Sequence, residues 1–254
     1  MLRAMLLLFL AVRVQAATEY RLTIDSTGDP LPRALGPNIH TVLVDGANRR
    51  VTDEAGVAVL SNDGGKTLIR LDHKLKTWWV SEVRALNPRR HITAPLPIVV
   101  KSDVRNVRVI SSDEPTDEVF AGLPTHKYIV RATYTLAADI SGSPLSADYG
   151  LTIFIWTSET LDPATAVPAV DLTTGVAEVD AQLAPKIAAV PGFPLKTMLL
   201  ATRAYAGGRP QAMSLTATVS GIRSVTPPPG AFERPRDYKN QAPVIVGPGA
   251  PGQP

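Results

Sequence analysis

Hydrophobic and polar residues alternate with a period of two along most of the chain. In residues 20–25, Leu22 and Ile24 share one face, and Arg21 and Thr23 share the other. Similar alternation occurs in residues 40–44, 107–109, 128–136 and 215–220. Strands with one apolar and one polar face are typical of antiparallel sheets, so the pattern predicts a mainly antiparallel β-protein.

Turn-forming residues separate these segments at short intervals. Asp45-Gly46 and Asp63-Gly64 supply the residue types that tight hairpin turns prefer, and Glu54-Ala55-Gly56 marks another turn. The spacing of 8–12 residues between turns is expected of all-β proteins. From about residue 38 to 80 the sequence therefore predicts a meander of five short strands.

Helical signals are sparse. The best candidate is 175–190, with Thr174 as N-cap and Pro191-Gly192 as the stop. Pro185 inside this segment should break or kink the helix into two pieces. Shorter helical turns are expected at 81–86 and 163–167.

Two strands are apolar on both faces, 151–156 and 198–200. Such strands are expected where both faces of a sheet are covered. A single, strongly curved antiparallel sheet, with a few helices covering its concave face, explains these strands together with the alternating ones.

Both ends of the chain differ from the body. Residues 1–16 combine a basic start, an apolar run and small residues before Ala17, which is the pattern of a cleaved secretory signal peptide. From Pro227 onward there are eight prolines and four glycines in 28 residues, a density that disfavours ladders and helices. We therefore expect one folded domain over 17–240 and a disordered Pro/Gly-rich tail over 241–254.

Composition narrows the location and the partners. The chain has no cysteine, which suits a bacterial periplasm better than a disulfide-framed extracellular domain. Removing Arg3 and Arg13 with the signal peptide lowers the formal charge from +3 to +1, and the basic residues form no long cluster. We expect no nucleic-acid partner, no transmembrane segment and a periplasmic location.

Motifs for catalysis or cofactor binding are missing from the sequence. The four histidines have no ligand-like spacing, and there is no nucleophile elbow or phosphate-binding loop. Asp72-His73-Lys74 is interpreted as a hairpin turn, because Asp side chains bond nearby backbone groups. We expect no metal, no cofactor and no enzymatic activity, although a catalytic triad from distant residues would leave no trace in a sequence.

Several segments together resemble the LolA/LolB-like superfamily, in an uncharacterised periplasmic branch of it. The segments, in chain order between about residues 40 and 239, are the hairpins 61–67 and 72–78, then 121–128 (AGLPTHKY), 154–156 (FIW), 192–196 (GFPLK) and 232–239 (FERPRDYK). The resemblance implies an open half-barrel of about ten or eleven antiparallel strands with helices in its mouth. It also implies a non-enzymatic protein whose apolar cavity carries acyl chains or other lipids.

The leading functional hypothesis is therefore a periplasmic carrier or sensor that binds a hydrophobic small molecule or lipid. The candidate cavity-lining residues are Trp78, Trp79, Tyr134, Phe154, Trp156, Phe193 and Leu199, each of which could equally be ordinary core. Trp78 and Trp79 point to opposite faces of their strand, so one of them at most faces an interior. Two alternatives remain: an envelope module that contacts a protein partner through its outer face or Pro-rich tail, and an unrecognised hydrolase.

Overall fold

The computed structural model describes residues 16–28, 38–81, 101–140, 143–167 and 172–241. These residues form one large open sheet and a two-stranded hairpin, β8 (Val119–Phe120) with β9 (Leu123–Pro124). In spatial order the strands of the large sheet are β14 (Lys239–Asn240), β6 (Thr77–Ser81), β5 (Leu68–Asp72), β4 (Val57–Ser61), β3 (Asn48–Asp53), β2 (Asn38–Asp45), β1 (Ala17–Gly28), β13 (Gln211–Val225), β12 (Phe193–Tyr205), β11 (Ser143–Ser158), β10 (His126–Ile140) and β7 (Lys101–Glu114).

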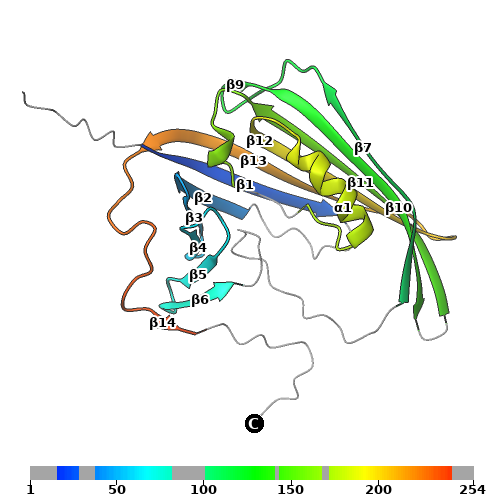
Figure 1. Cartoon of the computed structure of the whole chain (residues 1–254), viewed down its shortest axis with the longest axis horizontal. Helices are drawn as coiled ribbons and strands as arrows, with labels where there is room; N and C mark the ends of the chain where they lie inside the picture. Colours follow the sequence, from blue (N-terminus) through cyan, green and yellow to red (C-terminus); the bar gives the residue numbers. More distant parts are fainter. Residues whose placement is uncertain (1–15, 29–37, 82–100, 141–142, 168–171, 242–254) are drawn as a thin grey trace, which may run out of the picture.

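The fold class predicted from the alternation is confirmed. The sheet is strongly curved, and all its pairings are antiparallel except the short parallel contact of β14 with β6. In Figure 1 the strands β2–β6 turn away from the long strands β7 and β10–β13, so the sheet bends at β1. Twelve strands pair in it, against the ten or eleven expected, because the count includes the two-residue β14.

The meander of five short strands over about 38–80 is also confirmed, as β2–β6. Gly46 and Gly64 have φ angles of 56° and 74° in the turns where Asp-Gly pairs predicted them. Local sequence therefore accounts well for this half of the sheet.

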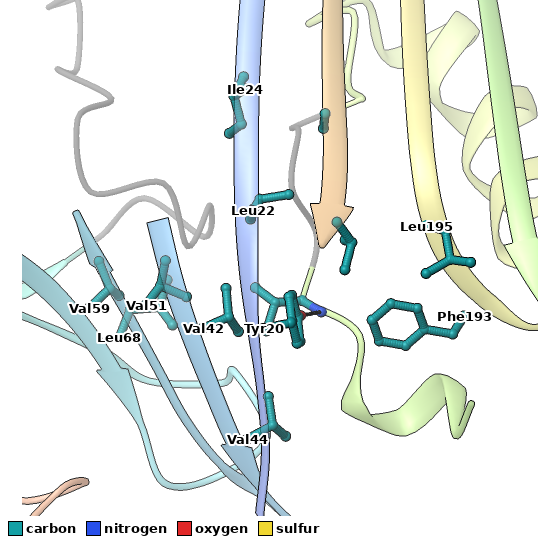
Figure 2. Packing of buried hydrophobic residues seen from close by; sticks show 13 residues of the cluster. Tyr20, Leu22, Ile24, Val42, Val44, Val51, Val59, Leu68, Phe193 and Leu195 are labelled. Atoms are coloured by element: carbon teal, nitrogen blue, oxygen red, sulfur yellow. Dashed lines mark hydrogen bonds between the residues drawn. The ribbon is translucent and has the colours of Figure 1, made fainter. Parts of the chain in front are cut away.

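The core lies on the concave face. One cluster spans β1–β5, β12 and β13 and includes Tyr20, Leu22, Phe193 and Leu195 (Figure 2). A second lies under the α-helix, between that helix and β7 and β10–β12. The residues that alternation placed on the apolar faces of these strands supply most of both clusters.

The helix differs from its prediction in two ways. α1 (Ala177–Ala188) is one helix that contains Pro185, and its N-cap is Val176. The proline is tolerated because Pro185 and Ala181 are exposed, so water can bond the Ala181 carbonyl that loses its partner. Thr174 does not cap the helix: its backbone N–H and hydroxyl donate to the carboxylate of Asp180, at 2.7 and 2.8 Å.

Fewer helices cover the sheet than expected. In the part of the chain that the structure describes, α1 is joined only by a 3-10 turn, η1 (Pro163–Thr165), at the place where a helical turn was predicted. The turn expected at 81–86 begins in β6, and its remainder lies outside the described residues, as do nearly all of the signal peptide and the tail.

Candidate functional site

The segment between β11 and β12 crosses the concave face of the sheet. It contains η1 and α1, and returns to the sheet at Phe193 (Figure 1). We call its described residues, 159–167 and 172–192, the cover segment. Val179 and Leu183 of α1 are buried against the second core cluster, so this part of the cover is held by apolar contacts.

Tyr20 on β1 holds the other end of the cover segment through two hydrogen bonds. Its hydroxyl accepts a hydrogen bond from the backbone N–H of Val167 at 3.0 Å and donates to the carbonyl of Thr165 at 3.3 Å. The Tyr20 ring meets the ring of Phe193 edge-on, with centroids 5.5 Å apart (Figure 2). Burial raises the pKa of Tyr20 above its ordinary value, so the side chain remains a neutral phenol at physiological pH.

A cavity of about 230 Å³ lies between the cover segment and the sheet. Its lining residues come from β1 and β11–β13 on the sheet side and from residues 166–167 and 172–192 on the cover side. They are Tyr20, Leu22, Ile155, Thr157, Ala166, Val167, Leu172, Ile187, Val190, Gly192, Phe193, Pro194, Thr197, Ala217 and Val219. The lining is mostly apolar, which suits a hydrophobic ligand.

Of the seven residues predicted to line a cavity, Phe193 lines this one. Tyr134 and Leu199 lie in the second core cluster beneath α1, where they pack against protein side chains. The two clusters share the same face of the sheet, so Tyr134 and Leu199 lie on the same face as the cavity, in a part that side chains fill.

Phe154 and Trp156 lie on the opposite face. Ile155, between them, lines the cavity, and neighbouring residues of a strand point to opposite sides. The Trp156 indole N–H donates to the Glu118 carboxylate, and Lys196 Nζ lies 4.8 Å from the centre of the Trp156 ring. Residues 151–156 are therefore apolar on both faces for two reasons. One face packs in the core, and the other carries this cluster of aromatic and lysine side chains.

Trp78 and Trp79 lie in the meander, away from the cavity. Trp78 packs with Leu60, Leu71 and Tyr238, and the Arg234 guanidinium lies 4.0 Å from the centre of the Trp78 ring. Trp79 stands opposite Arg70 in the pairing of β5 with β6. Their assignment to opposite faces agrees with the alternation of the strand.

The interpretation of Asp72-His73-Lys74 as a turn is confirmed. One oxygen of the Asp72 carboxylate accepts hydrogen bonds from the backbone N–H groups of Lys74 and Leu75, both at 2.9 Å. His73 has a further role, because its ring lies between the Arg50 guanidinium, at 3.1 Å, and the Tyr238 hydroxyl, at 2.6 Å. It therefore ties residues 226–241, the C-terminal strap, to the outer face of the meander.

His73 is also electrostatically perturbed. Burial, followed by the nearby Arg50 charge, lowers the pKa of His73, while Asp72 opposes the shift. Arg50 can only donate, so Nε2 of His73 accepts and Nδ1 carries the proton donated to Tyr238. The hydrogen bond between His73 and Tyr238 could not be predicted from the sequence, because the two residues are 165 positions apart.

Most residues of the cavity lining were also not predicted from the sequence. Tyr20 could have been found, because it shares the apolar face of β1 with Leu22 and Ile24. Nothing in the sequence marked Thr157 and Thr197 as cavity-lining residues, because threonine is common in strands whichever way it points. Ile187 and Val190 join the lining only because the cover segment folds back over the sheet.

Within the described residues there is no group of three or more His, Asp or Glu side chains arranged to hold a metal ion. No helix in the same residues is long and apolar enough to span a membrane. His40 is buried opposite Asp53 in the pairing of β2 with β3, and His91 lies outside the described residues.

No family model matches the sequence, and no curated protein matches it. Among solved structures, the chain is similar to the crystal structure of a LolA superfamily protein from Nitrosomonas europaea. The two share 13% sequence identity over 86% of this chain and 90% of that chain, with a TM-score of 0.31.

Proposed function

We propose that the protein is a non-enzymatic periplasmic carrier or sensor, and that it binds a lipid or acyl chain in the cavity under the cover segment. The observation that supports the proposal is the apolar cavity of about 230 Å³ lined by β1, β11–β13 and the cover segment. The periplasmic location of the protein is proposed from the signal-peptide pattern of residues 1–16.

The size of the cavity limits what it holds. An apolar cavity of about 150 Å³ is enough to bind benzene, and drug-sized ligands occupy about 300–1,000 Å³. A volume of about 230 Å³ lies between the two. The cavity therefore fits a single acyl chain segment or a small apolar molecule rather than a whole multi-chain lipid.

The energetics favour such a ligand without any special polar chemistry. Each buried methylene group contributes about 0.8 kcal/mol, so a chain segment of several methylenes offsets part of the free-energy cost of association. The hydrogen bonds from Tyr20 to the cover segment hold the cavity preformed, which reduces the ordering that binding requires.

The proposal is tested by purifying the protein from a bacterial periplasm and recording native mass spectra, followed by organic extraction. We expect a bound species that extraction removes, and uptake of the neutral fluorescent probe N-phenyl-1-naphthylamine by the extracted protein. A spectrum of bare protein, together with no probe uptake after extraction, would refute the proposal.

A further inference from the structure

Apart from Tyr20, the polar side chains of the described cavity wall belong to two threonines. Thr157 on β11 is 2% exposed, and it lines the cavity with Thr197 on β12. Thr197 pairs with Ile155, and Thr157 lies two residues further along β11 on the same face. A register shift between Trp156 and Thr157 places Thr157 opposite Pro194, so the two threonines lie on neighbouring strands on either side of this irregularity.

No hydrogen bond joins either hydroxyl to another of the described residues. Other threonines nearby do have a partner: Thr165 donates to the Asp162 carbonyl, and Thr202 donates to the Gly150 carbonyl. A hydroxyl that faces an apolar cavity without a partner leaves its hydrogen-bonding capacity unused, so a ligand that bonds it gains relative to a purely apolar ligand.

The remaining polar group of the wall is already engaged. The Tyr20 hydroxyl uses its proton on Thr165 and accepts from Val167. A ligand oxygen in this cavity is therefore directed to Thr157 and Thr197 rather than to Tyr20.

The described wall also contains no Asp, Glu, Lys, Arg or His side chain. The nearest lysine in sequence, Lys196, points to the opposite face from its neighbour Thr197, where it contacts the Trp156 ring. An ionised carboxylate or phosphate entering this site would lose its hydration without gaining an opposite charge. An uncharged oxygen group loses much less hydration and can be bonded by a hydroxyl.

From these observations we infer that the cavity selects a ligand whose apolar chain ends in an uncharged oxygen group, such as an alcohol, ester or ketone, held by Thr157 and Thr197. The inference rests on the proposed function and adds the chemical class of the ligand. It predicts discrimination against ionised fatty acids of the same chain length.

The test compares three twelve-carbon compounds on the extracted protein at pH 8: 1-dodecanol, dodecanoate and dodecane. Affinities are measured by displacement of N-phenyl-1-naphthylamine. We expect dodecanol to bind at least about tenfold more tightly than dodecanoate, and about fivefold more tightly than dodecane.

Variants assign the effect to the hydroxyl groups. Thr157→Val and Thr197→Val should each lower the affinity for dodecanol about five- to tenfold and leave that for dodecane unchanged. Thr157→Ser retains the hydroxyl and should retain dodecanol binding. Thr218→Val, the same change on the outer face of β13 opposite Lys196, is the matched control and should bind like wild type.

Dodecanoate binding as tight as dodecanol, or valine variants that bind dodecanol like wild type, would overturn the inference and leave the proposed function standing. Failure of every compound and of the fluorescent probe to bind would overturn the proposed function, and the inference with it.

Discussion

The hydroxyl of Tyr20 accepts a hydrogen bond from the backbone N–H of Val167, a residue 147 positions away in the sequence. The same hydroxyl donates to the carbonyl of Thr165. One side chain of β1 thus satisfies two backbone groups of the cover segment and closes one end of the cavity. If a ligand binds in this cavity as proposed, its binding is coupled to the stability of the cover through Tyr20.

Tyr20→Phe keeps the ring against Phe193 and removes both hydrogen bonds. It leaves the backbone N–H of Val167 buried without a partner, so we expect the free energy of unfolding to fall by about 1–3 kcal/mol. Amide hydrogen exchange at Val167 should become faster. Tyr205→Phe, on the far end of β12, removes a hydroxyl with no such contacts and should change neither quantity. Unchanged exchange at Val167 in Tyr20→Phe would show that the hydroxyl does not hold the cover.

Leu183→Ala tests how α1 is held on the sheet. Leu183 is 1% exposed in the second core cluster, and its truncation leaves a cavity beneath the helix. We expect a loss of about 2–5 kcal/mol in the free energy of unfolding, measured by urea denaturation. Leu145→Ala is the matched control, because Leu145 is 43% exposed and its truncation should cost less than about 0.5 kcal/mol. Equal effects of the two substitutions would contradict the packing of α1.

Asp180→Ala tests the start of α1. The Asp180 carboxylate accepts hydrogen bonds from the backbone N–H groups of Thr174 and Gly175 and from the Thr174 hydroxyl. Its removal should lower the free energy of unfolding by about 1 kcal/mol and speed amide exchange at residues 174 and 175. Glu178→Ala, an exposed acid in the same helical turn, should leave that exchange unchanged. Slowed or equal exchange in Asp180→Ala would exclude this role.

The contact of His73 with Arg50 and Tyr238 predicts a pH dependence of stability. The folded-state pKa of His73 lies below the ordinary histidine value of about 6.5, so the unfolded chain binds the proton more readily. The contribution of His73 is therefore full above about pH 6.5 and is lost as the pH falls from there through the folded-state pKa. Arg50 and Asp72 are the charged groups that act on the ring, and Tyr238 is its neutral partner.

His73→Gln retains an acceptor for Arg50 and a donor for Tyr238 and cannot titrate. We expect its urea midpoint to fall less than that of wild type between pH 7.5 and pH 5. A wild-type pH dependence in His73→Gln would rule out the proposed effect of this histidine.

The features that sequence predicted well depend on local chemistry. The five-stranded meander follows from Asp-Gly turns, and the core face of β1 and β13 follows from alternation at residues such as Leu22 and Val219. The helix prediction was right in place but wrong in detail, because an exposed Pro185 does not interrupt α1 and Thr174 bonds the Asp180 carboxylate instead of capping the helix.

The cavity could not be located in the same way. Its wall combines β1, β11–β13 and the cover segment, and the contact of Tyr20 with Val167 depends on how a long connection folds back. Aromatic residues guided the prediction, yet Trp156 serves a cluster on the outer face and Tyr134 fills the core under α1. Periodicity identifies the face of a strand, and only tertiary packing determines whether that face is filled.

The proposed function requires that ligands occupy the cavity under the cover segment. A larger side chain that fills this cavity should therefore prevent binding. Ala217 on β13 lines the cavity, whereas Ala212 on the same strand is exposed on the outer face. The measurement is the affinity for N-phenyl-1-naphthylamine by fluorescence titration of Ala217→Leu, Ala212→Leu and wild type. We expect a loss of at least about tenfold for Ala217→Leu and wild-type affinity for Ala212→Leu. Wild-type affinity in Ala217→Leu, with the protein folded, would place the ligand elsewhere and refute binding in this cavity.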